Sequence, residues 1–216
     1  MEILFENDDL WVVRKPFGMV CEAADGKGLA DLLAARNRGY AGVIHRLDRE
    51  VGGLTVFAKT PDAAADLSAR VAARNLRKEY LAAVRGEPES PTGEWRDLLY
   101  YDRAKNKVFP VRRERKGVKE AILRYRVERT ADLPGIGRAS LVAVEPLTGR
   151  THQIRVQFAS RGHAVLGDRR YGGPALPEGM EKGQLLLVCR SITIPVDGAD
   201  RTFSEDPAWI SLFGEL

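Results

Sequence analysis

Short runs of hydrophobic, β-branched and aromatic residues recur along this chain, and in residues 121–128 apolar and polar residues alternate with the two-residue period of a β-strand. Such runs, bounded by turn-forming residues, predict strands. We place them at residues 3–6, 10–14, 54–58, 80–84, 121–128, 140–145, 185–188 and 192–194. Strands dominate and few helices lie between them. This pattern favours an α+β fold with a largely antiparallel mixed central sheet and few flanking helices, rather than a βαβ nucleotide-binding fold.

The longer of two predicted helices follows the strand at residues 54–58. Thr60 is a suitable N-cap, Pro61 suits the first helical position, and Asp62 complements the helix dipole. Apolar residues then recur at helical spacing and predict a buried face, which consists of Ala64, Leu67 and Val71. We expect Asn75 to end this helix.

A second, short helix is predicted near residue 151. Thr151 is a candidate cap, Ile154 and Phe158 share one face, and Gly162 is the expected stop. The preceding turn, Gly149-Arg150, feeds this helix start. Backbone amides at such a start favour an anion, which could be a phosphate or a carboxylate.

Composition limits the class of protein. The 216 residues are 44% hydrophobic, enough for one large domain or two closely packed lobes. No basic leader followed by an apolar run opens the chain, and no apolar stretch approaches the ~20 residues that cross a bilayer. Cys21 and Cys189 lack metal-binding spacing and are expected to be buried thiols in a reducing cytoplasm. We therefore expect a cytoplasmic protein without a membrane segment or a structural zinc.

The net charge of +4 permits nucleic-acid binding without requiring it, so local clustering decides. Basic residues gather in one stretch: Arg103, Lys105, Lys107, Arg112, Arg113, Arg115, Lys116, Lys119, Arg124 and Arg126. Only three acidic residues, Asp102, Glu114 and Glu120, lie among them. The stretch is either a solvated charged hairpin or a surface that contacts a nucleic-acid backbone.

One aspartate lies in an arginine-rich segment, His45-Arg46-Leu47-Asp48-Arg49. Opposite charge within a few ångströms lowers an aspartate pKa by roughly one to three units, which would keep Asp48 ionised. An ionised carboxylate can act as a nucleophile or a base, and nearby guanidinium groups can hold phosphate. The alternative is an ordinary surface ion pair.

Two further segments carry candidate chemistry. In Lys78-Glu79-Tyr80, strand alternation sends Lys78 and Tyr80 to one side, where they could neutralise a charge and stack on a base. His152 has no partners at metal-ligand spacing and is expected to be an oriented hydrogen-bonding group. Two glycine-bearing turns, residues 162–168 and 171–173, are expected to shape a site or simply to connect strands.

Together these segments resemble the RluA-type pseudouridine synthases over nearly the whole chain. The resemblance rests on four stretches in order, at residues 12–18, 45–48, 78–86 and 149–172. They contain Lys15-Pro16-Phe17-Gly18, His45-Arg46-Leu47-Asp48, Lys78-Glu79-Tyr80, and Gly149-Arg150-Thr151-His152-Gln153-Ile154-Arg155 followed by Gly167-Asp168 and Tyr171-Gly172. Four matches in the right order make chance agreement improbable.

The resemblance implies a pseudouridine synthase fold with an RNA-binding cleft, and isomerisation of uridine to pseudouridine in ribosomal or transfer RNA. It implies no cofactor and no metal. Asp48 matches the essential aspartate, Tyr80 the active-site tyrosine and Arg155 an arginine that pairs with Asp48. Leu187 matches an apolar position that lines the pocket, and Arg46 a residue that fills the place of a flipped base.

The remaining candidate RNA contacts are His45, Lys78, Arg150, His152, Arg112 and Arg113. Larger members of the family carry an N-terminal S4 domain. Here the catalytic pattern begins almost at Met1, so we expect a single catalytic domain over residues 1–216 and no S4 domain. We also expect a monomer.

The chain departs from the family pattern after Asp48, where Val51-Gly52-Gly53 replaces Thr-Ser-Gly. Two other function classes remain open. An inactive RNA-binding protein would explain the altered segment, although Asp48, Tyr80 and Arg155 together count against it. A glycoside-type hydrolase would need a second acid near Asp48. Asp168 is the candidate for that acid, although its Gly-Asp turn favours a structural role.

Overall fold

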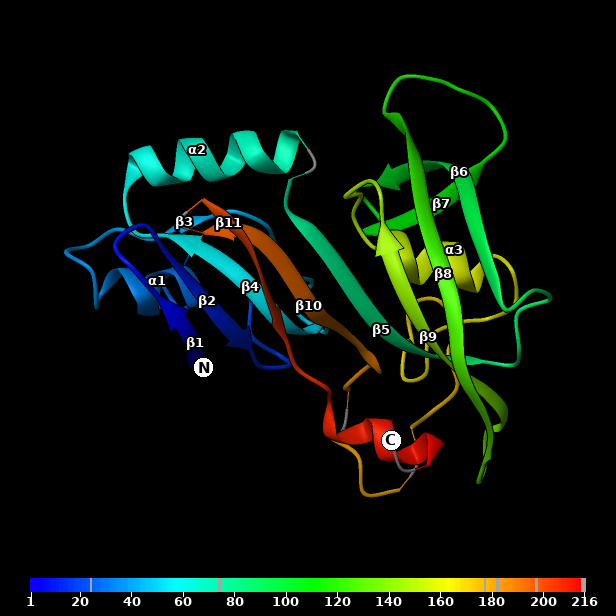
Figure 1. The fold of residues 1–216 in the computed structure, drawn as a ribbon. Coiled ribbons are helices and arrows are strands. Elements are labelled where there is room, and N and C mark those ends of the chain that lie inside the picture. Colours follow the sequence, from blue (N-terminus) through cyan, green and yellow to red (C-terminus); the bar gives the residue numbers. More distant parts are fainter. Residues whose placement is uncertain (24, 74, 177, 182, 197, 215–216) are drawn as a thin grey trace. The chain divides into compact units, whose positions relative to one another are not determined.

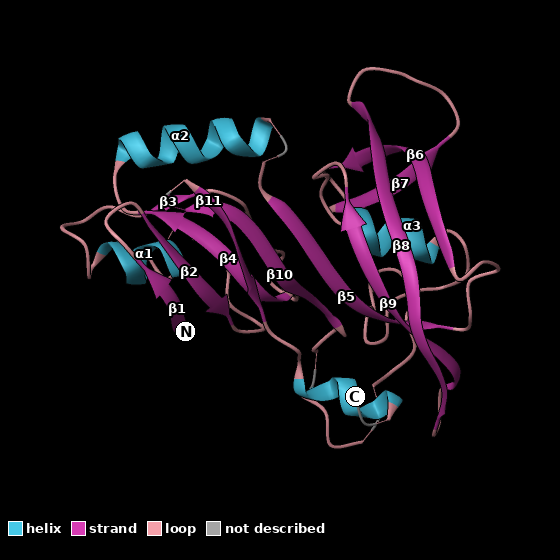
Figure 2. Cartoon of the chain, in the orientation of Figure 1, coloured by secondary structure: helices cyan, strands magenta, loops and turns pink. Residues whose placement is uncertain are grey.

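The protein is described from a computed structural model, which covers residues 1–23, 25–73, 75–176, 178–181, 183–196 and 198–214. The chain folds as two compact units. The first comprises Met1–Lys78 and Val188–Pro207, and the second comprises Glu79–Leu187 and the residues from Ala208 onward. Strands outnumber helices in both units (Figure 2), which confirms the predicted α+β class.

In the first unit the strands pair in the order β1-β2-β4-β10. Their bounds are β1 Glu2–Glu6, β2 Leu10–Lys15, β4 Gly52–Ala58 and β10 Leu187–Val196, with β3 Gly42–Val43 beside β4 and β11 Ala199–Ser204 beside β10. Among these described strands the pairings are antiparallel except that of β4 with β10, which is parallel. Figure 1 shows β2, β4 and β10 running beside one another. The sheet is therefore mixed, as predicted.

Local chemistry explains the first hairpin and the central strands. The Asn7 side-chain oxygen accepts hydrogen bonds from the backbone N–H groups of Asp9 (3.0 Å) and Leu10 (2.9 Å), which closes the turn between β1 and β2. Residues 10–13 and 54–58 are buried without alternation. Consecutive burial means that β2 and β4 are covered on both faces.

Helix α2, Pro61–Ala72, begins where the sequence predicts. Thr60 accepts a hydrogen bond from the N–H of Ala63 (3.1 Å), and Pro61 occupies the first helical position. The buried face differs from the prediction: Leu67 is buried as expected, but Ala63 is buried in place of Ala64, and Val71 is half-buried. The first unit also contains the six-residue helix α1, Leu29–Ala34.

The second unit contains an antiparallel sheet in the order β5-β9-β8-β6-β7. Its elements are β5 Arg77–Arg85, β6 Thr92–Asp102, β7 Lys107–Val111, β8 Val118–Leu133, β9 Gly137–Pro146, helix α3 Gln153–Ala159 and the 3₁₀ helix η1 Ala208–Phe213. β7 is the last strand in this order, so one of its backbone edges is not paired with another strand that the structure describes.

Helix α3 of the second unit is almost entirely buried. Six of its seven residues, Gln153 to Phe158, are buried. Phe158 packs edge-on against Trp95 of β6, with ring centroids 4.6 Å apart. The Gln157 amide donates to Asp97 (2.7 Å), and Asp97 also accepts two hydrogen bonds from Arg161 (2.8 and 3.1 Å). Polar side chains inside a core require partners, and these contacts connect α3 to β6.

Several sequence expectations need correction. Residues 185–188 and 192–194 do not form two late strands; residues 187–196 form the single strand β10. Thr151 does not cap α3: the N-cap is His152, whose φ of 51° is left-handed and whose side chain makes no capping hydrogen bond. The basic stretch contains β7, an exposed turn at residues 112–117 and the start of β8. Strands β6, β7 and β11 were not predicted, because charged and aromatic residues interrupt their alternation.

None of the helices that the structure describes is long and apolar enough to cross a membrane.

Candidate active site

Asp48 lies in the loop between β3 and β4. Leu47 is buried beside it, Asp48 is half-buried, and Arg46 is exposed. The Asp48 carbonyl accepts a hydrogen bond from the N–H of Val51 (3.1 Å), which makes a turn at this point. The loop therefore leaves Asp48 partly exposed while the adjacent Leu47 side chain is buried.

The Lys15 ammonium binds the backbone of this loop. The residue is fully buried, and its ammonium donates to the carbonyls of Met19 (2.6 Å), Pro16 (3.2 Å) and Arg49 (3.3 Å). The Arg49 carbonyl also accepts from the N–H of Gly18 (2.9 Å). Burial lowers the pKa of Lys15 to about 8. A single cation thus joins residues 16–19 to the residue that follows Asp48.

Cys21 contacts the backbone of this loop at Leu47. The N–H of Leu47 donates to the Cys21 sulfur (3.4 Å), and the thiol lies 3.8 Å from the Leu47 carbonyl. Burial raises the pKa of this thiol, so it remains protonated and unreactive. The predicted buried thiol is confirmed here, and Cys189 is buried as well.

His45 and Lys78 form a desolvated pair in the first unit. His45 is buried, and neither ring nitrogen has a hydrogen-bond partner in the part of the chain that the structure describes. Burial, and then the charge of Lys78, hold the pKa of His45 well below its usual range. Burial also lowers the pKa of Lys78. The imidazole is therefore neutral at physiological pH.

Arg46 is free of strong structural constraints on its side chain. Its guanidinium lies 4.0 Å from the Glu22 carboxylate, and both side chains are more than half exposed. Such an exposed pair contributes ~1 kcal/mol or less. The geometry leaves Arg46 able to move toward a ligand.

Arg155 and Asp168 form a buried ion pair in the second unit. Arg155 Nε and Nη2 donate to the two Asp168 oxygens at 2.6 and 2.9 Å. Asp168 also accepts from the backbone N–H groups of Arg170 (3.1 Å) and Tyr171 (3.3 Å). A general acid donates a proton of its own. In all four of these hydrogen bonds, by contrast, the Asp168 carboxylate is the acceptor. Asp168 thus fits the structural role rather than that of the second acid of a hydrolase.

The turn before α3 is closed by the Gln153 side chain. The Arg150 N–H (3.0 Å) and the Thr148 hydroxyl (2.8 Å) both donate to the Gln153 side-chain oxygen. The Arg150 N–H is therefore occupied by Gln153, and anion binding by the other backbone amides of this helix start remains a prediction. The Arg150 side chain donates to the Glu120 carbonyl (2.8 Å). Its contact with RNA remains a prediction.

The other predicted site residues occupy ordered positions. His152 is hydrogen-bonded to the Tyr171 hydroxyl (2.9 Å), which agrees with the predicted hydrogen-bonding role. Among the described residues, no three His, Cys, Asp or Glu side chains gather in a way that could hold a metal. Tyr80 is buried in β5, Leu187 is buried at the start of β10, and Arg112 and Arg113 are exposed after β7.

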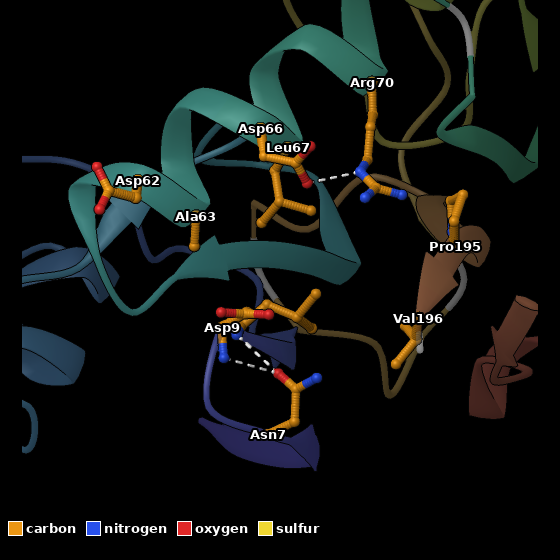
Figure 3. Close-up of a pocket in the computed structure, with 10 residues that line it drawn as sticks. Asn7, Asp9, Asp62, Ala63, Asp66, Leu67, Arg70, Pro195 and Val196 are labelled. Carbon is orange, nitrogen blue, oxygen red and sulfur yellow. Dashed lines mark hydrogen bonds and ion pairs between the residues drawn. The ribbon is translucent and has the colours of Figure 1, made fainter. Parts of the chain in front are cut away.

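A pocket of about 300 Å³ lies elsewhere in the first unit (Figure 3). Its lining residues come from the β1–β2 turn, α2 and the end of β10: Asn7, Asp9, Leu10, Asp62, Ala63, Asp66, Leu67, Arg70, Pro195 and Val196. Three carboxylates line it, and its arginine is already paired with Asp66 (2.6 Å). This charge is unsuited to phosphate, and none of the predicted site residues lies there.

Sequence reasoning missed the supporting role of Lys15 and, although it favoured a structural role for Asp168, did not identify Arg155 as its partner. Both belong to stretches that carry the resemblance, Lys15 before Pro16 and Asp168 after Gly167. A lysine in an otherwise apolar strand is one available signal, because buried lysines need partners. No local signal identifies the partner of Asp168.

Similarity to known proteins identifies the family of this chain. Residues 9–160 match the family model described as RNA pseudouridylate synthase. Ribosomal large subunit pseudouridine synthase D of Zymomonas mobilis is 35% identical, and the alignment covers 80% of this chain and 56% of that protein. Ribosomal large subunit pseudouridine synthase C of Pasteurella multocida is 31% identical over 83% of this chain and 54% of that protein.

The chain spans about half the length of the curated relatives that it matches. The solved structure of human RNA pseudouridylate synthase domain containing 1 has a TM-score of 0.78 at 24% identity and covers 97% of this chain and 84% of that chain. That likeness shows a shared fold, and the family match covers more than half of the chain. The chain therefore belongs to the RNA pseudouridylate synthase family, as its resemblance to the RluA-type enzymes predicts.

Proposed function

We propose that this protein isomerises specific uridines of ribosomal RNA to pseudouridine, with transfer RNA as the alternative substrate. The match of residues 9–160 to the RNA pseudouridylate synthase family carries the proposal. The names of two relatives specify the large ribosomal subunit, which favours ribosomal RNA as the first substrate to test.

The reaction breaks the bond between uracil N1 and ribose C1′ and forms one between C5 and C1′. C5 loses a proton and N1 gains one, so atoms and electrons balance within the nucleotide. We assign to Asp48 the attack on C1′ or on the uracil ring, or proton abstraction that leads to a glycal. The fixed backbone on both sides of Asp48 supports this assignment, since a reacting group has to be held in place.

Further roles follow the family resemblance. We assign stacking on the uracil to Tyr80 and charge stabilisation to Arg155. The target base has to leave its stack, which costs a few kcal/mol. We assign to Arg46 the position in the RNA stack that the flipped base leaves, because a flat guanidinium can stack where a base was. The exposure of its side chain supports this role. Additional RNA contacts are assigned to His45, Lys78, Arg150, His152, Leu187, Arg112 and Arg113.

The decisive variant is Asp48→Asn, which keeps the side-chain shape but removes the charge. The wild-type protein should convert one or a few uridines in ribosomal or transfer RNA transcripts. We expect Asp48→Asn to lower that rate by a factor of about 10³ or more, because a nucleophile contributes on that scale. RNA affinity should stay within about threefold, since one anion leaves the basic contacts intact. Carbodiimide-dependent stops in reverse transcription measure the product, and filter retention measures binding.

Asp62→Asn is the matched control, because Asp62 is an exposed carboxylate of α2 in the same unit. It should behave as wild type in both assays. Pseudouridine formation by Asp48→Asn at the wild-type rate would show that the assigned nucleophile is wrong. A wild-type protein that binds RNA without modifying it would favour the inactive RNA-binding class. Val51→Thr with Gly52→Ser, which restores the family pattern, would then test the cause.

A further inference from the structure

The segment that follows Asp168 docks on the unpaired edge of β7. The Tyr171 hydroxyl accepts a hydrogen bond from the N–H of Val108 in β7 (2.9 Å). The Arg170 guanidinium donates to the carbonyl of Asn106, just before the same strand. The Lys107 ammonium lies 5.3 Å from the centre of the Tyr171 ring. Edge strands need such cover, and here side chains rather than another strand supply it.

The same segment holds Arg155. Asp168 binds the guanidinium at two points, and its own position is fixed by the N–H groups of Arg170 and Tyr171. The turn is tight, because a Cβ at Gly173 would overlap the Val165 carbonyl. The Arg155 guanidinium also lies 5.5 Å from the centre of the Tyr171 ring. One short turn thus contacts both the edge of β7 and the arginine.

Tyr171 makes a third connection through His152. Because the Val108 N–H can only donate, the phenol oxygen accepts there and its hydrogen is available for His152 Nδ1, 2.9 Å away. Burial raises the pKa of Tyr171, so the phenol keeps its hydrogen at physiological pH. His152 precedes α3 and has a left-handed φ of 51°, a conformation that needs such support.

We propose that Tyr171 and Asp168 are positioning residues for Arg155, and that Tyr171 couples the β6–β7 hairpin to that arginine. Asp168 sets the orientation of the guanidinium, and Tyr171 fixes the start of α3 and the edge of β7 relative to it. The basic turn at residues 112–117 follows β7 directly, so RNA held there is linked to Arg155 through Val108 and Tyr171. The inference rests on the proposed function, in which Arg155 acts at the uridine.

Tyr171→Phe is the variant that tests the coupling, because it removes one oxygen and keeps the ring. Tyr101→Phe is the matched control: Tyr101 lies in the same hairpin, and its hydroxyl donates to the Asn106 side chain (2.8 Å). We expect Tyr171→Phe to lower kcat about tenfold while KM for RNA stays within about twofold, since an interaction with the reacting state is lost rather than binding. Tyr101→Phe should leave both unchanged. Equal changes of kcat and KM in Tyr171→Phe and Tyr101→Phe would overturn the proposal.

A double-mutant cycle separates positioning from general stabilisation. Asp168→Asn should lower kcat in the wild-type background but have little further effect when Arg155 is already Lys, because both changes act through the same guanidinium. Additive effects in the cycle would mean that Asp168 acts independently of Arg155, and the positioning role would be wrong.

A second measurement does not depend on activity. The Nε–H of Arg155 donates to a buried carboxylate, so its NMR signal should exchange slowly with water. Tyr171→Phe should speed that exchange at least tenfold, and Tyr101→Phe should not. Unchanged exchange in Tyr171→Phe overturns the coupling even if the wild-type protein makes no pseudouridine. An inactive wild type with faster exchange in Tyr171→Phe would instead contradict the proposed function and leave the coupling supported.

Discussion

At the residue scale, a buried cation supports the loop that carries Asp48. Lys15 has no water contact and three carbonyl partners. Burial opposes the ammonium, whereas the carbonyls favour it. Burial is the larger influence on the pKa of Lys15, which is lowered from 10.5 to about 8.

The lowered pKa of Lys15 predicts a pH dependence of stability. Between pH 8 and 10.5 the unfolded chain keeps a proton on Lys15 that the folded protein has lost, so the free energy of unfolding should rise with pH there and fall as pH drops through about 8. The gain should be roughly 1–3 kcal/mol, the lower figure allowing for solvent screening. Urea unfolding at pH 7, 8.5 and 10 measures it. In Lys15→Met the rise in the free energy of unfolding between pH 8 and 10.5 should disappear. The same rise in both proteins would show that Lys15 is not its cause.

At the element scale, the parallel pairing of β4 with β10 depends on one glycine. Gly53 has a φ of 102° and pairs with Cys189 of β10. A Cβ at Gly53 would overlap the backbone of Cys189, whereas a Cβ at Gly52 would make ordinary contacts, the nearest being 3.4 Å from the Lys15 carbonyl. Gly53 occupies the position of the family glycine. Gly52, which stands where the family has serine, therefore lies at a position with room for a side chain.

The two neighbouring glycines should respond differently to alanine. Gly53→Ala should lower the free energy of unfolding by about 3 kcal/mol or more, because it combines a left-handed φ with a backbone clash. Gly52→Ala should be neutral or stabilising by ~0.5 kcal/mol, since it reduces the freedom of the unfolded chain. Chemical denaturation of both variants measures the difference. Equal effects would show that β10 shifts to accept the added methyl group.

The two main helices show why some elements follow from sequence. The start of α2 was predicted because its cap, Thr60, bonds to a residue three positions later. The start of α3 was mispredicted because His152 depends on Tyr171, nineteen residues away. Short-range chemistry is visible in a sequence window, whereas a left-handed residue held by a distant phenol is not.

At the scale of the whole molecule, many acidic residues offset basic ones in surface pairs. Arg96 lies against Glu94 and Glu120 at 3.3 and 3.1 Å. Arg112 and Arg113 are exposed, and neither forms an ion pair with any residue that the structure describes. The turn at residues 112–117 is therefore locally cationic, although the net charge of the chain is only +4.

The salt dependence of RNA binding should identify this turn. Each phosphate contact releases counterions, so log K should fall linearly with log salt. Arg112→Ala and Arg113→Ala should each reduce that slope by about 0.7–0.9, whereas Arg96→Ala should not, because its charge is already offset. Filter binding at several salt concentrations measures the slopes. Equal slopes for all three variants would mean that the turn does not contact the backbone of RNA.

The sequence by itself determined the strand-rich class, the family and the candidates Asp48, Tyr80 and Arg155, because these rest on local periodicity and on short motifs. Only the tertiary structure revealed that Lys15 braces residue 49, that Asp168 grips Arg155 and that Tyr171 joins β7 to α3. Each of these contacts satisfies a buried polar group with a partner outside its own local segment. Burial creates that requirement, and burial is decided by the packing of the folded chain.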